Sequence, residues 1–265
     1  MSSSTNWLNV IASAGYSAKT VMYSLLGLFI LSSVITAAER EKATQKHVFE
    51  TLQSQPFGKA LLFGLIVGLV CYALWRWLQG FLNTESLKMD KAKDIVMRGF
   101  LFISGLFYFA AAYLGANVLM GTDQKSDGSN SKHVSQQLMQ YEWGILLVAA
   151  VGAAIITFAF IQFKHAYTAD FLKKFDQNQL TGTRQQATKT AGRLGYFARG
   201  VVYLFVGSFF ALSAFQSDPS EAGGLQKALT TLTQQPFGLY LLAAVGAGFI
   251  MFGVYCGFEA KYRRT

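Results

Sequence analysis

The sequence has few charged residues, only two cysteines and no grouping of catalytic residue types, and each shortage narrows the possible functions. Charged residues make up 14% of the 265 residues and hydrophobic residues 52%, which is too apolar for an ordinary soluble domain. Cys71 and Cys256 stand singly inside hydrophobic stretches, so their spacing suggests neither a metal site nor a disulfide. No cluster of His, Asp and Glu, and no base beside a nucleophilic Ser or Cys, falls within these stretches. We therefore expect no enzyme activity, no cofactor and no bound metal.

The hydrophobic residues gather in six stretches that carry almost no charge. Most are close to the roughly 20 residues that a helix needs to cross a bilayer, and a helix satisfies its own backbone groups in lipid. Polar links separate the stretches, which argues against buried helices in a soluble core. The first stretch ends in a faint resemblance to a signal-peptide cleavage site, but no basic segment precedes it, so we predict a retained helix. The stretches are about 18–38, 57–78, 100–120, 144–163, 200–215 and 237–258.

The chain also repeats itself, which indicates that it is built from modules. Residues 15–79 recur as residues 195–259, 180 positions later. The agreement persists through a polar loop, because the motif Gln55-Pro56-Phe57-Gly58 returns as Gln235-Pro236-Phe237-Gly238. Both copies therefore contain two hydrophobic stretches joined by a similar link.

A third, degenerate copy lies in the middle of the chain. Residues 46–48 recur as residues 132–134, 86 positions later, whereas the first helix of this copy aligns at an offset of 79. This offset places Arg98 opposite Lys19 and attributes the difference to an insertion in the polar run Gly121–Ser131. The sequence thus predicts an all-α integral membrane protein with six transmembrane helices in three tandem hairpins.

The three hairpins have the same orientation, so an axis along the membrane normal relates them. A closed pseudo-threefold bundle and a side-by-side row are both compatible with the sequence. The predicted repeats are residues 1–82, 83–175 and 184–265.

The repeated motif resembles a known bacterial membrane family. The pattern Gly-Tyr-x-Ala-Lys/Arg-x-Val-x-Tyr, best preserved at residues 195–203, precedes a Pro-Phe-Gly link into a Gly-rich helix. This pattern is similar to that of domain of unknown function 1206. The resemblance covers nearly the whole chain and implies three two-helix repeats in a bacterial inner membrane. It implies no activity and no catalytic residues.

The distribution of charge predicts the orientation. With both termini on one side, that side carries 16 basic and 6 acidic residues, and the other side carries 7 basic and 8 acidic residues. The positive-inside rule then places both termini in the cytoplasm. The family resemblance implies that the membrane is the plasma (inner) membrane of a bacterial cell. The basic face would contact anionic lipid headgroups. Nucleic-acid binding is not expected, because no compact basic domain exists.

Two sets of repeated residues are candidates for binding or for helix packing. Basic residues begin the odd helices or end the second helix, and they would either snorkel to the cytoplasmic boundary or form a cation ring that holds a lipid phosphate or another anion. Small residues at four-residue spacing in the even helices would let helix backbones approach closely. The cations are Lys19, Arg76, Arg98 and Arg199, and the small residues are Gly64, Gly68, Ala150, Ala154, Ala244 and Gly248.

The polar links offer further candidates. His47 and His133 could share a metal, but the third repeat has Lys227 at this place, so duplication of a helix-start residue explains them better. The link 164–193 is the longest on the cytoplasmic side and is the best surface for a soluble protein partner.

The sequence supports a multi-pass membrane protein with a structural or accessory role, which binds lipid or a partner. The alternative is a conduit for a small solute or an ion through the repeat bundle. Neutral polar residues at the helix centres, including Ser24, Ser104 and Thr157, count against a proton-coupled pump but do not exclude a passive pore.

Overall fold

Six long helices dominate the computed structural model, which describes residues 3–35, 45–82, 92–122, 135–176 and 179–263. All six are long and apolar enough to cross a membrane. This confirms the predicted all-α class with six transmembrane helices. The helices are α1 (Ser3–Ile35), α3 (Gly58–Leu82), α4 (Ala92–Met120), α6 (Glu142–Thr168), α7 (Gly182–Gln216) and α9 (Gly238–Tyr262).

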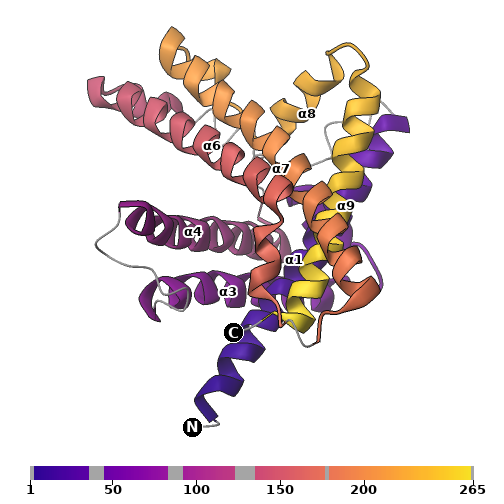
Figure 1. Cartoon of the computed structure of the whole chain (residues 1–265). Helices are drawn as coiled ribbons and strands as arrows, with labels where there is room; N and C mark the ends of the chain where they lie inside the picture. Colours follow the sequence, from indigo (N-terminus) through magenta and orange to yellow (C-terminus); the bar gives the residue numbers. More distant parts are fainter. Residues whose placement is uncertain (1–2, 36–44, 83–91, 123–134, 177–178, 264–265) are drawn as a thin grey trace.

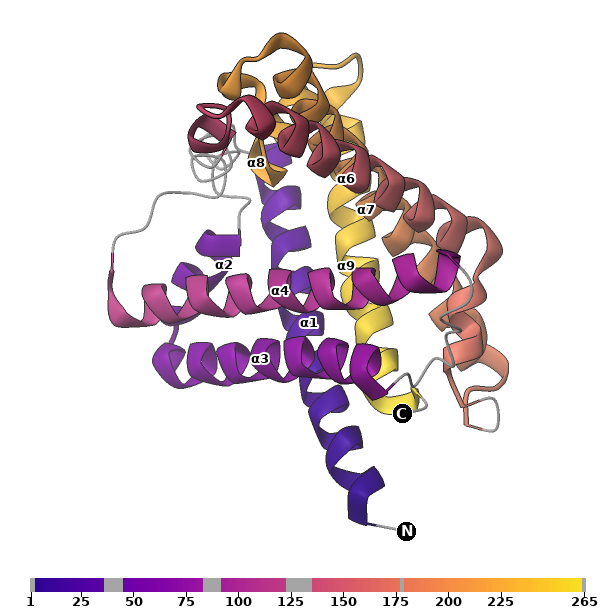
Figure 2. The same ribbon diagram turned by 90° about the vertical axis from the view of Figure 1, so that its left-hand side faces the viewer.

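The long helices cross one another at an angle. Both α3 and α9 contain 25 residues, so each is about 37 Å long at 1.5 Å per residue. This exceeds a hydrocarbon core of about 30 Å and leaves room for tilt. The helices use this freedom, because α3 and α4 lie across α1 and α9 (Figure 2).

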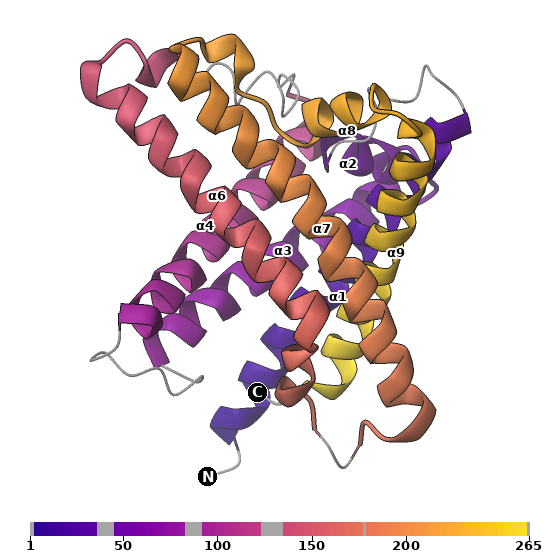
Figure 3. The same ribbon diagram turned by 45° about the horizontal axis from the view of Figure 1, so that its top comes forward.

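Each long helix pairs with a helix from a different repeat. Helix α1 packs along α9, α3 along α4, and α6 along α7 (Figures 1 and 3). Further contacts join α1 to α3 and α7 to α9, within the first and third repeats. The interfaces therefore interlock the three repeats.

The middle repeat breaks the threefold pattern. In the described residues its helices α4 and α6 barely touch, although the rings of Phe100 and Phe158 stack with centroids 4.4 Å apart. The six helices thus form a curved row in the order α4–α3–α1–α9–α7–α6, with an open side between its two ends. The structure therefore has the helix order of a threefold ring, but the ring is not closed.

Close contacts reveal the register of the middle repeat. The even-helix residues Trp77, Phe163 and Gly257 are equivalent at the repeat offsets. A Cβ on Gly105 would lie 2.3 Å from Trp77 and one on Gly200 would lie 2.7 Å from Phe163, while Gly257 faces Thr20. Thr20 and Gly200 are equivalent, so Gly105 takes their place in α4, at an offset of 85.

The predicted alignment of Lys19 with Arg98 is therefore wrong. The α4 residue at the place of Lys19 is Ser104, and the residue at the place of Tyr23 is Tyr108. The alignment followed basic residues, whereas helix packing preserves small residues at the points of closest approach. The polar run that was interpreted as an insertion lies mostly outside the described residues.

Short helices cover the first and third repeats at the end where α3 and α9 begin. Helix α2 (Gln45–Gln53) buries Val48 and Phe49, and α8 (Leu225–Thr233) buries Leu229 and Leu232. Because these apolar residues recur at helical spacing, each short helix has one face to pack against the bundle. A 3-10 turn, η3 (Pro219–Glu221), precedes α8.

The Pro-Phe-Gly motif forms the turn into α3 and α9. Phe57 and Phe237 adopt positive φ angles of 60° and 59° and are exposed, which suits an aromatic anchor at the membrane boundary. A Cβ on Gly58 would lie 2.2 Å from the carbonyl oxygen of Gln53, and Gly238 meets Thr233 in the same way. The motif therefore requires glycine, because α3 and α9 begin against the last turn of the short helix before them.

The predicted small-residue seams need correction. Gly68 and Gly248 do lie at close contacts, since an added Cβ would come within 2.5 Å of Ala18 and 2.3 Å of Ala198. The prediction is wrong for the others, because Gly64 has no neighbour within 4 Å of an added Cβ and the three alanines are exposed. One turn of helix is enough to move a residue from the interface to the surface. The exposed alanines are Ala150, Ala154 and Ala244.

Two glycine crossings that the spacing argument missed bring the helix pairs together. An added Cβ on Gly27 of α1 would lie 2.7 Å from the carbonyl oxygen of Gly246 in α9. In the equivalent pair, one on Gly207 of α7 would lie 3.1 Å from the carbonyl oxygen of Gly152 in α6. Such close backbone approach stabilises helix pairs in lipid, where no hydrophobic effect drives the association.

Candidate functional site

Two of the predicted surface cations are buried inside the bundle. The side chains of Lys19 and Arg199 are only 4% and 8% exposed. Both lie against Phe252, and Lys19 also contacts Tyr72. Tyr72 and Phe252 each follow the first residue of their helix by 14 positions, which places them about 21 Å from its first residue and about 15 Å from its last residue. The prediction that Lys19 and Arg199 snorkel to the cytoplasmic boundary is therefore wrong.

Aromatic side chains surround the ammonium group of Lys19. Its Nζ donates a hydrogen bond of 3.0 Å to the hydroxyl of Tyr72 and lies 4.3 Å from the centroid of that ring. The ring centroids of Phe252, Tyr16 and Tyr108 lie 5.3, 5.4 and 5.7 Å from the same nitrogen. Four rings from α1, α3, α4 and α9 thus form a cation–π cage.

Arg199 lies in a second cage that shares Phe252. Its Nη2 donates a hydrogen bond of 2.7 Å to the hydroxyl of Tyr203. The guanidinium carbon lies 4.2 Å from the ring centroid of Phe252 and 5.3 Å from that of Tyr23. The Nε atom of Arg199 is buried and has no hydrogen-bond partner.

Three tyrosines at equivalent positions of the three repeats meet beside these cations. Tyr23 and Tyr203 are 180 positions apart, and the corrected register adds Tyr108 of α4. The hydroxyls of Tyr23 and Tyr108 are 3.2 Å apart and share a hydrogen bond. The sequence contains all three tyrosines, but only the correct register reveals their equivalence. We call Lys19, Arg199, Tyr23, Tyr72, Tyr108, Tyr203 and Phe252 the central cluster.

The central cluster carries two positive charges and lacks a negative one. Among the described residues, no carboxylate lies within ion-pair distance of Lys19 or Arg199. A desolvated cation–π contact is worth about 2 kcal/mol, whereas burying one ion costs several kcal/mol. The rings and phenols therefore offset much of this cost, but they supply no negative charge. An ionisable group at membrane depth with no charged partner is a functional candidate.

The other two predicted cations join α3 to α4. Nε of Arg76 donates to Oγ of Ser104 at 3.2 Å and Nη1 donates to Oε1 of Gln79 at 3.1 Å. Nε of Arg98 donates to the backbone oxygen of Gly80 at 2.6 Å, near the negative end of the α3 dipole. The four cations therefore do not form one ring.

The C-terminal end of the chain is tied to the 164–193 link. Glu259 and Arg263 form a buried ion pair, and the guanidinium carbon of Arg263 lies 5.1 Å from the ring centroid of Tyr16. The backbone nitrogen of Asp176 donates to the oxygen of Tyr262 at 3.0 Å. A polar pocket of about 370 Å³ lies here, lined in part by these residues. The sequence did not predict a role for Glu259, which directly follows the last apolar stretch.

The link itself is largely docked on the bundle. Phe171 of the 3-10 helix η2 (Asp170–Lys174), together with Phe175 and Leu180, is buried. Nδ1 of His165 donates to Oδ1 of Asp170 at 2.5 Å. Partial burial is the largest single influence and raises the pKa of the Asp170 carboxyl, but the hydrogen bond from His165 and the electrostatic attraction of His165, Lys164 and Lys174 together outweigh it, so this pKa lies below its usual value.

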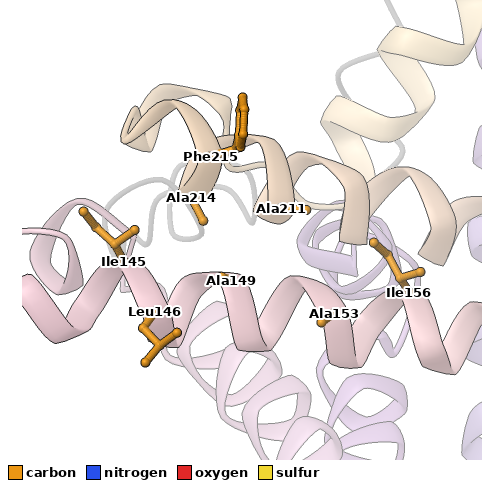
Figure 4. Close-up of a pocket in the computed structure, with 8 residues that line it drawn as sticks. All are labelled: Ile145, Leu146, Ala149, Ala153, Ile156, Ala211, Ala214 and Phe215. Carbon is orange, nitrogen blue, oxygen red and sulfur yellow. The ribbon is translucent and has the colours of Figure 1, made fainter.

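An apolar groove of about 550 Å³ lies between α6 and α7 (Figure 4). Ala149 and Ile156 of α6 line this space with Ala211 and Ala214 of α7. Its lining contains no titratable or nucleophilic side chain, so the groove offers no means of catalysis.

The described residues contain no group of three His, Cys, Asp or Glu side chains that could hold a metal. His133, one half of the considered histidine pair, lies outside them. Cys71 and Cys256 are free thiols. Thus the central cluster is the most unusual chemical grouping in the part of the chain that the structure describes.

Comparison with known proteins supports the repeat structure. The chain is 29% identical over 260 residues to the uncharacterized protein YxxB of Bacillus subtilis (strain 168), covering 97% of this chain and 92% of the relative. No solved structure matches the chain. The sequence profile of Domain of Unknown Function (DUF1206) matches three times, at residues 14–83, 100–169 and 194–263. These three matches include most of the chain, which therefore belongs to the DUF1206 family of domains of unknown function.

Proposed function

We propose that this multi-pass membrane protein is a non-catalytic accessory protein of the bacterial inner membrane. Both termini lie in the cytoplasm, and the inner end of the bundle binds anionic lipid headgroups. The inner end is the side that holds the first residues of α1, α4 and α7 and the last residues of α3, α6 and α9.

The distribution of exposed cations carries this proposal. Exposed basic side chains gather at the inner ends of α6, α7 and α9, where the carboxylates of Asp170 and Glu259 are already engaged by His165 and Arg263. Each basic residue near an anionic surface contributes about 1 kcal/mol of attraction. The exposed cations at this end include Lys164, Lys173, Arg184, Arg193 and Lys261.

The packed interior favours an accessory role over the alternative of a conduit. Large aromatic side chains fill the interior at and around the central cluster. The largest fully buried side chains include Tyr16, Trp75, Phe252 and Tyr255. An open pore would need polar groups around a continuous path, whereas here the rings contact one another. A soluble partner would meet the exposed part of the link around residues 181–187.

Native mass spectrometry of the full chain in nanodiscs tests the lipid proposal. The variant Lys164→Gln/Lys173→Gln/Arg193→Gln should retain fewer phosphatidylglycerol or cardiolipin molecules than the wild type, because three inner cations are gone. The matched control Lys46→Gln/Lys59→Gln removes outer cations and should retain as many as the wild type. Equal loss in both variants, or none in either, would contradict the proposal.

A flux assay tests the conduit alternative. Reconstituted vesicles that contain the protein should release trapped anions, cations and small neutral solutes no faster than empty vesicles. Release that depends on the protein would replace the accessory role by the conduit.

A further inference from the structure

We propose that the central cluster binds a small monovalent inorganic anion of halide size, held between Lys19 and Arg199. This interior site differs from the lipid contacts proposed for the inner end, since it lies inside the bundle and uses different cations. It would supply the negative charge that the surrounding side chains lack.

The hydrogen bonds of the cluster leave donors without acceptors. Lys19 and Arg199 donate hydrogen bonds to phenol hydroxyls, those of Tyr72 and Tyr203 respectively. A phenol oxygen that accepts still carries its own proton to donate. The mutual bond of Tyr23 and Tyr108 uses one of their two hydroxyl protons. Since Nε of Arg199 is also unpartnered, the cluster has a surplus of donors, which is the requirement of an anion.

Both cations contact the same aromatic ring, so both charges act on the space around it. Nζ of Lys19 and the guanidinium carbon of Arg199 lie 5.3 and 4.2 Å from the ring centroid of Phe252, so at most about 10 Å separates them. The hydroxyl pair of Tyr23 and Tyr108 adjoins both cations, because the Tyr108 ring lies near Lys19 and the Tyr23 ring near Arg199. Two positive charges buried in the bundle are costly without a negative partner, so a bound anion is favoured over an empty site.

The surroundings select a small ligand with diffuse charge. Lys19 and Arg199 are almost fully buried, so a phospholipid headgroup with its acyl chains has no room to reach both. A small, weakly hydrated halide needs few donors to replace its hydration, which suits the unpartnered donors of the cluster. A multivalent oxyanion would need more donors to replace its hydration than the cluster provides.

The arginine cage lies next to the side of the helix row between α4 and α6. Phe158 of α6 stacks on Phe100 of α4 across this side, and its ring centroid lies 5.0 Å from that of Tyr203. Phe158 therefore stands between the open side and the arginine cage, and a small shift of α6 against α4 would uncover Tyr203.

Chloride binding to the purified full chain tests the proposal directly. Broadening of the chloride NMR signal should saturate with protein and reverse when bromide is added. The thermal midpoint should rise with chloride or bromide and stay unchanged in gluconate of equal ionic strength, because only a bound ligand stabilises the folded state.

Variants locate the site. Arg199→Gln and Lys19→Gln should each weaken chloride binding at least ten-fold, whereas Arg98→Gln, a cation outside the cluster, should bind like the wild type. Tyr203→Phe keeps the ring and the charge, and it serves as the milder variant if Arg199→Gln does not fold. Lipid retention at the inner end should be unchanged in Lys19→Gln, Arg199→Gln and Tyr203→Phe, so failure of this site and failure of the proposed function are distinguishable.

Three results would overturn the proposal. The first is a wild-type protein that does not broaden the chloride NMR signal and whose thermal midpoint does not change with chloride or bromide. The second is chloride binding that survives in Lys19→Gln and Arg199→Gln alike. The third is tyrosinate absorbance at neutral pH without any anion dependence, which would mean that a phenolate of the cluster balances the charge.

Discussion

At the scale of single residues, position on the helix surface decides the role more than residue type does. Gly64 and Gly68 are identical in chemistry and one turn apart, yet only Gly68 lies against a neighbouring helix. Arg98 and Arg199 both follow repeated motifs, yet one caps α3 from outside and the other lies inside the bundle. Spacing along the chain suggests such candidates but does not orient them.

The two glycines give a matched test of packing. Gly68→Val should lower stability by about 1–3 kcal/mol, since two methyl groups must enter space already filled by Ala18. Gly64→Val adds the same groups to open space and should leave the thermal midpoint in detergent nearly unchanged. Equal midpoints for both variants would show that α1 and α3 are not in close contact there.

The Asp170–His165 contact predicts an acid-sensitive link. The folded-state pKa of Asp170 is lowered, so the pair stabilises the fold above the carboxyl's unfolded pKa of about 3.9. That stability disappears as the pH falls through the lowered folded pKa. In Asp170→Asn, unfolding monitored by intrinsic fluorescence should lose this acid-dependent component. The prediction is wrong if the variant and the wild type lose stability in parallel as the pH falls below about 4.

At the scale of elements, the 164–193 link is a docked part of the fold. Phe171 lies against Tyr196 and Tyr255, with ring centroids 5.2 and 5.0 Å away. The isolated bridge between Phe175 and Arg263 attaches the link to the end of α9. The predicted partner surface is therefore reduced to the exposed residues near the start of α7.

Removing the Phe171 ring should release this link. Phe171→Ala deletes a buried aromatic side chain, a change that typically costs about 3–5 kcal/mol. Trypsin added to inverted membrane vesicles should then cleave after Lys173 or Lys174 much faster than in the wild type. Phe160→Ala removes an exposed ring from α6 and should not change the cleavage rate.

At the scale of the whole molecule, the interlocked pairs have a functional consequence. Because α1, α3, α4, α7 and α9 all contribute rings or charges to the central cluster, the cluster forms only when the three repeats assemble. The least buried spans are α4 and α6, at the two ends of the row. Any movement between repeats is therefore easiest at that open side.

The predicted orientation of the molecule is open to a direct test. A green fluorescent protein fused after residue 265 should fluoresce, and alkaline phosphatase fused there should be inactive, because the basic inner end faces the cytoplasm. Phosphatase fused in the outer link after Pro219 should be active. The reverse pattern at both sites would invert the topology and move the proposed lipid contacts to the other leaflet.

The sequence alone was informative wherever the signal was local or repeated. The lengths of the hydrophobic stretches predicted the six spans. The internal repeat at a spacing of 180 residues, with its Pro-Phe-Gly turns, predicted the hairpins. The directions of the side chains were predicted wrongly, because neighbouring residues of a helix point 100° apart. The alignment of the middle repeat was also six residues off, so it paired Lys19 with Arg98 and not with Ser104. Gly105 was the available clue, since it matches Gly200 as a small residue.

Composition, hydrophobic length and duplication by themselves determined that this protein is an all-helical membrane protein of three tandem hairpins. In lipid a chain must satisfy its backbone hydrogen bonds within each helix, so these features predict the fold without any information about long-range contacts. Only the tertiary structure decided that the ring of helices is open between α4 and α6, and that Lys19 and Arg199 lie inside it. Burial depends on which helix faces meet across repeats, and the glycine crossings that bring those faces together join residues up to 219 positions apart, Gly27 and Gly246.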